Sequence, residues 1–170
     1  MQNQISKIRV LIVDDDEEDF LITSEYIKQI QTYDFVIDWC YEHKKALEKM
    51  SKSEYDIYFV DYLLGGQTGL DLIRDAIKNN CEEPIVLLTG KGNHRVDMEA
   101  MKAGAFDYLV KSELNAEKME RSIRYSLEKT ATLKALRINE RKFRNFFEKS
   151  KDAVFFADDT YATTLRRDSA

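Results

Sequence analysis

Side chains that could take part in phosphoryl transfer follow four of the apolar runs in this sequence. They are Asp14 and Asp15 after the first run, Asp61 after the third, Thr89 after the fourth and Lys111 after the fifth. Clustered carboxylates bind a hard divalent cation such as Mg²⁺. A lysine ammonium adds a compact positive charge, and a hydroxyl can donate a hydrogen bond to a phosphoryl oxygen. A carboxylate that attacks phosphorus needs this neutralisation, so the set predicts a phosphoryl-acceptor site.

These side chains share one site only if the apolar runs are strands of one sheet. The expected strands are Ile8–Val13, Phe35–Cys40, Ile57–Val60, Ile85–Leu88 and Phe106–Val110. Amphipathic stretches of helical length separate them, at Glu17–Ile30, Glu42–Met50, Gly69–Asn79 and Asn93–Ala103. Such alternation predicts an α/β fold with a doubly wound parallel sheet, and ligands gather at the carboxyl ends of its strands. Asp61 is the expected nucleophile, because it follows a central strand and stands apart from the acidic run.

The pattern changes after Val110. From Asn115 to about Lys149 the sequence contains no Gly or Pro and is rich in Ala, Leu, Glu, Lys and Arg, which predicts one long helix. Its second half places apolar residues on an a/d heptad seam that Glu140 interrupts. They are Leu133, Leu136, Phe143 and Phe147. We expect the first half to pack on the sheet and the second half to seek a partner helix.

Composition excludes several classes of protein. The net charge of -5 is unevenly distributed, with 12 Lys/Arg against 21 Asp/Glu in residues 1–110, 11 against 6 in residues 111–149 and 3 against 4 in residues 150–170. Acids interspersed in the basic helix favour a solvated face over direct nucleic-acid binding. No run approaches the roughly 18 uncharged apolar residues of a membrane span, and Met1–Arg9 lacks the apolar core of a signal peptide. Cys40 and Cys81 are expected to be buried thiols in a cytoplasmic protein.

Four stretches together resemble the receiver domain of response regulators, the chemotaxis-regulator-like module of two-component signalling. They are VLIVDDD at 10–16, DIYFVDYLLGGQTGLDLI at 56–73, IVLLTGKG at 85–92 and AMKAGAFDYLVKS at 100–112, within about residues 7–127. The resemblance implies a flavodoxin-like sheet of five parallel strands in the order 2-1-3-4-5, here with an extended C-terminal helix. It also implies a histidine kinase or phosphotransfer protein as the phosphoryl donor, and a downstream output domain as the target.

The resemblance also implies a role for each site residue. The Mg²⁺ ligands would be Asp14, Asp15, Asp61 and the backbone carbonyl of Leu63. Asp61 would accept the phosphoryl group, which Thr89 and Lys111 would then contact. Tyr108 would be an aromatic switch that alters the face formed by residues 93–103, 106–110 and the helix from residue 115. This face and the long helix are both candidates for pairing two copies of the chain.

Some loop positions bear on the reach of these groups. Gly69, eight residues after Asp61, matches the glycine that closes the loop in the family. Ser112 follows Lys111 where the family usually has proline, often after a cis bond, and a cis bond before serine costs about 3 kcal/mol. Gly65 and Gly90 stand where proline and a small residue such as alanine are common, which indicates looser loops.

The segment ERKFRNFFEKSKDAVFFAD at 140–158 resembles the opening of a PAS sensor domain, a helix followed by an apolar first strand. We therefore expect a receiver domain at 1–127 and an extension of its last helix, a signalling helix or linker, at 128–149. Residues 150–170 would be a truncated PAS-like start or a disordered tail, of which 160–170 match no element. The parent protein would be a longer receiver–PAS protein, with a missing part that could be a kinase or a cyclase.

Two other interpretations stay open. A haloacid-dehalogenase-like phosphatase would use Asp14–Asp16 as its D-x-D motif with a later threonine and lysine, but that motif lacks its usual following threonine and leaves Asp61 without a role. A degenerate receiver would bind partners without phosphorylation, and the complete acid, threonine and lysine set argues against it. The sequence therefore predicts a regulatory switch rather than an enzyme.

Overall fold

The computed structural model describes residues 7–90 and 94–165, with side chains for 7–90 and 95–149. The chain forms two units, Met1–Thr130 and Ala131–Ala170.

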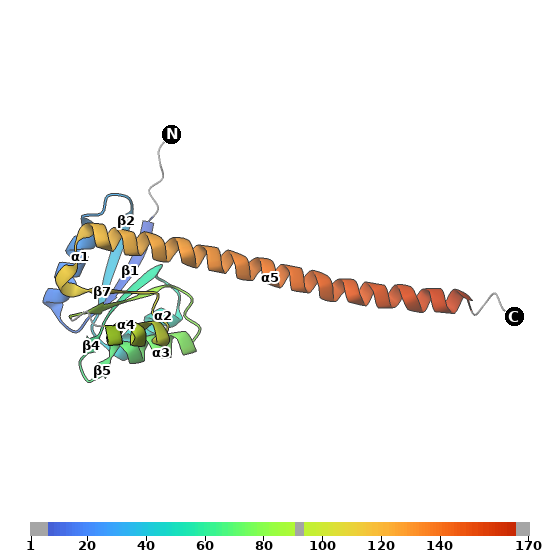
Figure 1. Ribbon diagram of the computed structural model, residues 1–170, viewed down its shortest axis with the longest axis horizontal. Helices are drawn as coiled ribbons and strands as arrows, with labels where there is room; N and C mark the ends of the chain where they lie inside the picture. The colour runs from blue at the N-terminus through green and yellow to red at the C-terminus, as the bar shows by residue number, and fades with distance from the viewer. Residues whose placement is uncertain (1–6, 91–93, 166–170) are drawn as a thin grey trace. The chain divides into compact units, whose positions relative to one another are not determined.

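A five-stranded parallel sheet lies at the centre of the first unit (Figure 1). Its strands are β1 (Lys7–Val13), β2 (Asp34–Cys40), β3 (Ile57–Asp61), β6 (Ile85–Thr89) and β7 (Asp107–Val110). Their order across the sheet is β2-β1-β3-β6-β7, which corresponds to 2-1-3-4-5 when these five strands alone are numbered. The predicted flavodoxin-like fold is confirmed. β3 is buried along its whole length, because it is central in the sheet and covered on both faces.

Helices cover both faces of this sheet (Figure 1). They are α1 (Glu17–Lys28), α2 (His43–Ser51), α3 (Gly69–Lys78), α4 (His94–Ala103) and the first turns of α5 (Ala116–Leu165). Successive strand side chains point to opposite faces, so β1 feeds two separate cores. Leu11 and Val13 join the core built with α2, α3 and α4. Val10 and Ile12 join the core built with α1 and the first turns of α5.

Capping side chains mark the starts of α1 and α3. Asp16 accepts hydrogen bonds from the backbone N–H groups of Glu18 and Asp19 and begins α1 directly after the strand-end acids. Thr68 and Asp71 form a reciprocal capping box that begins α3. A capping side chain satisfies backbone donors that the helix leaves without partners. These caps hold the loops after β1 and β3 close to the sheet edge.

Several elements differ from the sequence predictions. A short antiparallel hairpin, β4 (Leu63–Leu64) with β5 (Gln67–Thr68), follows β3. A 3₁₀ turn, η1 (Lys111–Glu113), follows β7.

No peptide bond in the described part of the chain is cis, so Lys111–Ser112 is trans. Cys40 and Cys81 are buried, as predicted, and neither forms a disulfide there.

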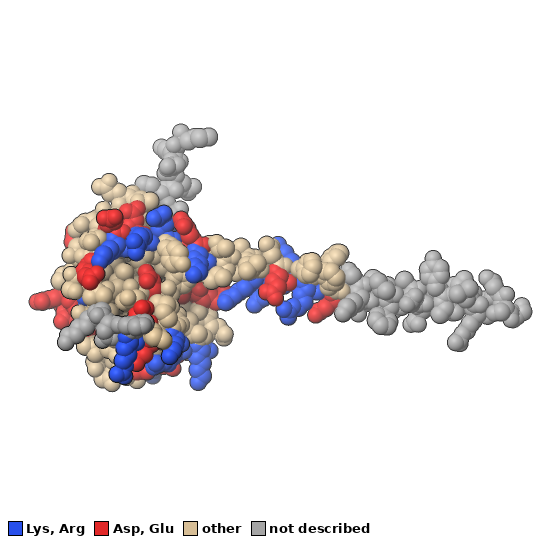
Figure 2. Space-filling model, in the orientation of Figure 1, with Lys and Arg blue, Asp and Glu red and all other residues tan. Residues whose placement is uncertain are grey.

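The last helix is longer than predicted. α5 continues to Leu165 instead of ending near Lys149, so the apolar strand expected in the PAS-like segment is helical. In the second unit, the side chains of the predicted seam are 43–65% exposed. They are Leu133, Leu136, Phe143 and Phe147. Figure 2 shows acidic and basic side chains interspersed over the visible face of the described residues, and none of the described helices is both long and apolar enough to cross a bilayer.

Candidate functional site

A cleft of about 750 Å³ opens at the carboxyl ends of β1, β3, β6 and β7. We call it the acid cleft. All six residues predicted to hold the metal or the phosphoryl group line it. They are Asp14, Asp15, Asp61, Leu63, Thr89 and Lys111, joined by Asp16, Asp19, Tyr62, Gly90 and Val96. The βαβ topology produces this convergence, because it brings the carboxyl ends of all parallel strands to one edge.

Three carboxylates form a cluster in the acid cleft. One oxygen from each of Asp14, Asp15 and Asp61 lies within 4.8 Å of the others. Asp14 is fully buried, Asp61 is 6% exposed and Asp15 is exposed. Asp61 stands apart from the acidic run in sequence but not in space. Oxygen ligands at this spacing, one of them open to solvent, fit a hard divalent cation that keeps part of its water shell.

Backbone amides fix each of these carboxylates. The N–H of Asp16 donates to Asp14 Oδ1 over 3.0 Å, and the N–H of Leu63 donates to Asp61 Oδ2 over 2.9 Å. The N–H of Gly65 donates to Asp15 Oδ2 over 2.9 Å. Gly65 has φ of 58°, a left-handed conformation that glycine adopts without the steric cost of a β-carbon. The hairpin after β3 therefore holds Asp61 and Asp15 together.

Among the described residues that line the acid cleft, Lys111 is the one with a cationic side chain. Its Nζ lies 2.6 Å from Asp61 Oδ1, 2.9 Å from Asp14 Oδ2 and 2.6 Å from Asp19 Oδ2. An ammonium has three N–H donors, so each can serve one carboxylate. Burial alone would lower the pKa of Lys111, but its hydrogen bonds to these carboxylates outweigh that effect and raise it. The lysine stays protonated at neutral pH.

Burial disfavours the ionised form of the Asp14 and Asp61 carboxylates. Burial raises the pKa of Asp14 to about 6, although hydrogen bonds from Lys111 and the Asp16 amide oppose the rise. Burial also raises the pKa of Asp61, again against the effect of Lys111. One ammonium therefore does not fully offset the desolvation of two buried carboxylates. The site favours additional positive charge.

Thr89 and Tyr108 occupy different surroundings. Thr89 is 3% exposed, lines the acid cleft and is in register with Val110, next to Lys111. Tyr108 is half-buried and packs against the core beneath α3 and α4. It is not among the residues that line the acid cleft. Its backbone N–H donates to Asp107 Oδ1 over 2.9 Å.

Two residues of this region were not expected from the sequence. Asp19 was not predicted as a site residue, yet its carboxylate contacts Lys111. Trp39, the single tryptophan of the chain, donates from Nε1 to the main-chain oxygen of Asp14 over 2.8 Å and stacks on Phe20 at 5.1 Å between ring centroids. Its position near the carboxyl end of β2, the strand beside β1, was the feature of the sequence that could have placed Trp39 close to Asp14.

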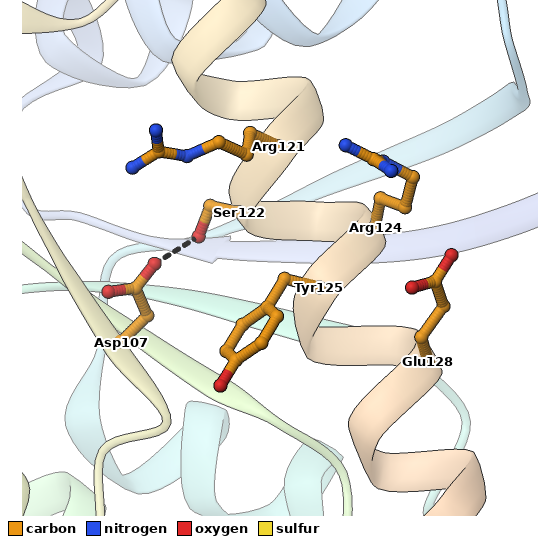
Figure 3. A pocket seen from close by; sticks show the side chains of 6 residues that line it. All are labelled: Asp107, Arg121, Ser122, Arg124, Tyr125 and Glu128. Atoms are coloured by element: carbon orange, nitrogen blue, oxygen red, sulfur yellow. Dashed lines mark hydrogen bonds between the residues drawn. The ribbon is translucent and has the colours of Figure 1, made fainter.

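A second pocket, of about 340 Å³, lies between β7 and α5 (Figure 3). Its lining residues are Asp107, Arg121, Ser122, Arg124, Tyr125 and Glu128. The Ser122 hydroxyl donates to Asp107 Oδ2 over 2.7 Å and ties α5 to the start of β7 (Figure 3). The pocket mixes acids and bases, in contrast to the carboxylate cluster of the acid cleft.

The model of the response regulator receiver domain family matches residues 10–124. The two-component response regulator PhoP of Pseudomonas aeruginosa is 32% identical over 104 residues, which cover 61% of this chain and 45% of that protein. The regulatory protein VanR of Enterococcus faecium is 33% identical over 103 residues, covering 61% and 43%. The matched region spans less than half the length of these relatives.

Solved structures agree in fold. The CheY-like receiver domain protein of Methanospirillum hungatei JF-1 superposes with a TM-score of 0.63 at 23% identity, covering 75% of this chain and 98% of that one. A two-component response regulator of Clostridium difficile gives a TM-score of 0.62 at 24% identity, covering 71% and 96%. The matched family model spans both the sheet and the acid cleft, so the chain belongs to the response regulator receiver domain family.

Proposed function

We propose that this chain is a phosphorylatable switch in which Asp61 accepts a phosphoryl group from a histidine kinase or phosphotransfer protein. The observation that carries the proposal is the cluster of Asp14, Asp15 and Asp61 with the Lys111 ammonium 2.6 Å from Asp61. In the transfer, the P–N bond of a phosphohistidine breaks as a carboxylate oxygen of Asp61 bonds to phosphorus. The released imidazole keeps the electron pair of the broken bond and takes a proton.

Asp61 is better placed to react than Asp14. Asp14 has no exposed side-chain surface. Asp61 lies at the end of β3 with 9% of its side chain exposed in the acid cleft. This difference supports the receiver over a phosphatase whose nucleophile would be Asp14.

The residues present fit Mg²⁺, with Asp14, Asp15, Asp61 and the carbonyl of Leu63 as its protein ligands. When bound, the cation supplies the charge neutralisation that phosphoryl oxygens require. Lys111 would turn from the Asp61 carboxylate to a phosphoryl oxygen, and the Thr89 hydroxyl would donate to another. Both residues line the cleft beside Asp61, which supports these roles.

The switch would pass through Tyr108 to the face formed by α4, β7 and α5. A shift of Thr89 toward the phosphoryl group would leave space for the half-buried Tyr108 ring to turn inward. Phosphorylation would bias two existing states of this face, and need not create a new one. Replacement of Tyr108 by alanine should uncouple phosphorylation from output, and intact output in that variant would contradict this step.

We also propose that residues 140–158 are the start of a PAS-like domain. Two copies of the chain would pair through the α4–β7–α5 face or through the second half of α5. The helical conformation of residues 128–149 supports the signalling helix proposed there. Light-scattering masses measured before and after phosphorylation would test pairing.

The central test is phosphorylation by a small donor. Purified protein is incubated with Mg²⁺ and acetyl phosphate, and its intact mass is measured. We expect a gain of one phosphoryl group in the wild type and none in Asp61→Asn. A gain retained in Asp61→Asn would move the acceptor elsewhere, and Asp14→Asn would then test the phosphatase alternative. No gain in the wild type would favour a degenerate receiver.

A further inference from the structure

Lys111 contacts three carboxylates, and they are not equivalent. Asp14 and Asp61 belong to the cluster that would hold a cation, whereas Asp19 does not. A divalent cation and an ammonium repel each other, and both need the oxygens of Asp14 and Asp61. Lys111 therefore competes with a cation for this cluster. Its contact with Asp19 affects how easily the ammonium can move away from Asp14 and Asp61.

Asp19 is fixed at the rim of the acid cleft. It lies in the first turn of α1, where its backbone N–H donates to the capping side chain of Asp16. Its side chain is 41% exposed, in contrast to 0% for Asp14 and 9% for Asp61, yet it reaches Lys111 Nζ over 2.6 Å. The flexible four-carbon stem of lysine allows Nζ to move toward this outer carboxylate.

We infer that Asp19 is a positioning residue that holds Lys111 at the rim of the acid cleft when a cation occupies the carboxylate cluster. By this means it strengthens Mg²⁺ binding. The inference rests on the proposed function, because it assumes that the cluster binds Mg²⁺. It goes beyond that function because Asp19, a carboxylate of α1, would control part of the Mg²⁺ affinity through Lys111.

Glu18 provides a matched control. It lies in the same acidic first turn of α1 and is exposed, but it does not line the acid cleft. Glu18→Gln and Asp19→Asn each remove one negative charge near the same helix N-terminus. They therefore change the general field of the site and the helix-dipole interaction in a similar way, and only Asp19→Asn removes a contact with Lys111.

The experiment is a Mg²⁺ titration of the whole chain without any phosphodonor. Trp39 reports the titration by fluorescence through its hydrogen bond to the Asp14 main chain, and calorimetry gives the same constant independently. We expect Asp19→Asn to raise the Kd for Mg²⁺ about three- to tenfold, and Glu18→Gln to raise it less than about twofold. Asp19→Glu should recover part of the loss.

A double-mutant cycle shows whether Asp19 acts through Lys111. In the Lys111→Met background, with folding checked by circular dichroism, Asp19→Asn should weaken Mg²⁺ binding no more than Glu18→Gln does. Absence of Mg²⁺ binding in the wild type would overturn the proposed function itself. If the wild type binds Mg²⁺ and Asp19→Asn and Glu18→Gln lose equal affinity, only the role of Asp19 is overturned. This comparison does not depend on whether Lys111→Met folds.

Discussion

The main-chain oxygen of Asp61 occupies the space that a β-carbon on Gly69 would need. Gly69 begins α3, and its N–H donates to the Tyr62 carbonyl over 2.8 Å. The loop that leaves Asp61 therefore returns to touch it. Only a residue without a side chain closes the loop this tightly.

Gly69→Ala should lower the free energy of unfolding by about 2–4 kcal/mol, because the colliding partner is backbone that cannot rotate away. Gly66 is the control, since a β-carbon there meets no atom within 4 Å. Gly66→Ala should be neutral or stabilising by up to about 1 kcal/mol. Urea denaturation of both variants measures the difference, and equal stabilities would refute the tight closure.

Stability of the metal-free protein should fall as pH rises from about 4 to 7. The pKa of Asp14 is raised from 3.8 to about 6, so the folded state binds more protons than the unfolded state between these values. Such a rise corresponds to roughly 3 kcal/mol. This loss of stability is absent below the pKa of Asp14 in the unfolded state and complete above its pKa in the folded state. The raised pKa of Asp61 contributes in the same direction.

Asp14→Asn should remove this penalty. In the presence of a chelator, we expect a gain of about 2–3 kcal/mol at pH 7.5 that shrinks below about 1 kcal/mol at pH 4. Urea denaturation at both pH values measures it. A change of the same size at both would show that the carboxylate does not titrate as described.

If the proposed Mg²⁺ site exists, Mg²⁺ should stabilise the folded protein at pH 7.5, because only the folded state assembles the cluster of Asp14, Asp15 and Asp61. A concentration 100 times the Kd corresponds to about 2.7 kcal/mol, measured as a rise in Tm. Asp15→Asn should abolish most of this rise without disturbing the core, since Asp15 is exposed. Glu17→Gln, in the same acidic run, should keep it, and equal loss in both would argue against a specific site.

The two parts of α5 should differ in their contribution to stability. Ile123 is fully buried in the core beside α1, whereas Ile138 is 53% exposed. Ile123→Ala should cost about 2–4 kcal/mol of unfolding free energy and Ile138→Ala less than about 0.5 kcal/mol. Chemical denaturation of the matched pair tests this. A large cost at Ile138 would mean that it is buried in solution against a partner.

The sheet was predictable because fully buried parallel strands are continuous apolar runs. β3, for example, extends only to Asp61 beyond its predicted end at Val60. The convergence of the strand-end residues followed from topology alone. The β4–β5 hairpin could not be predicted in this way, because amides bound to Asp61 and Asp15 help to hold it, and no hydrophobic pattern marks it.

Two further features lay beyond sequence reasoning. An acid in the first turn of a helix ordinarily complements the helix dipole, so the contact of Asp19 with Lys111 depends on side-chain directions that spacing does not give. The sequence of α5 contains no Gly or Pro, so nothing local marks its end. Its predicted end near Lys149 was wrong, because the helix continues to Leu165.

The main-chain amides of Leu63 and Gly65 tie carboxylates at the ends of the neighbouring strands β1 and β3 to one short ribbon of chain. Because Leu63 holds Asp61 while Gly65 holds Asp15, a disturbance of either carboxylate pulls on the same few peptide units. Leu63 presents 65% of its surface to solvent on this ribbon. Displacement of this ribbon would therefore move the carboxylates of Asp15 and Asp61 together.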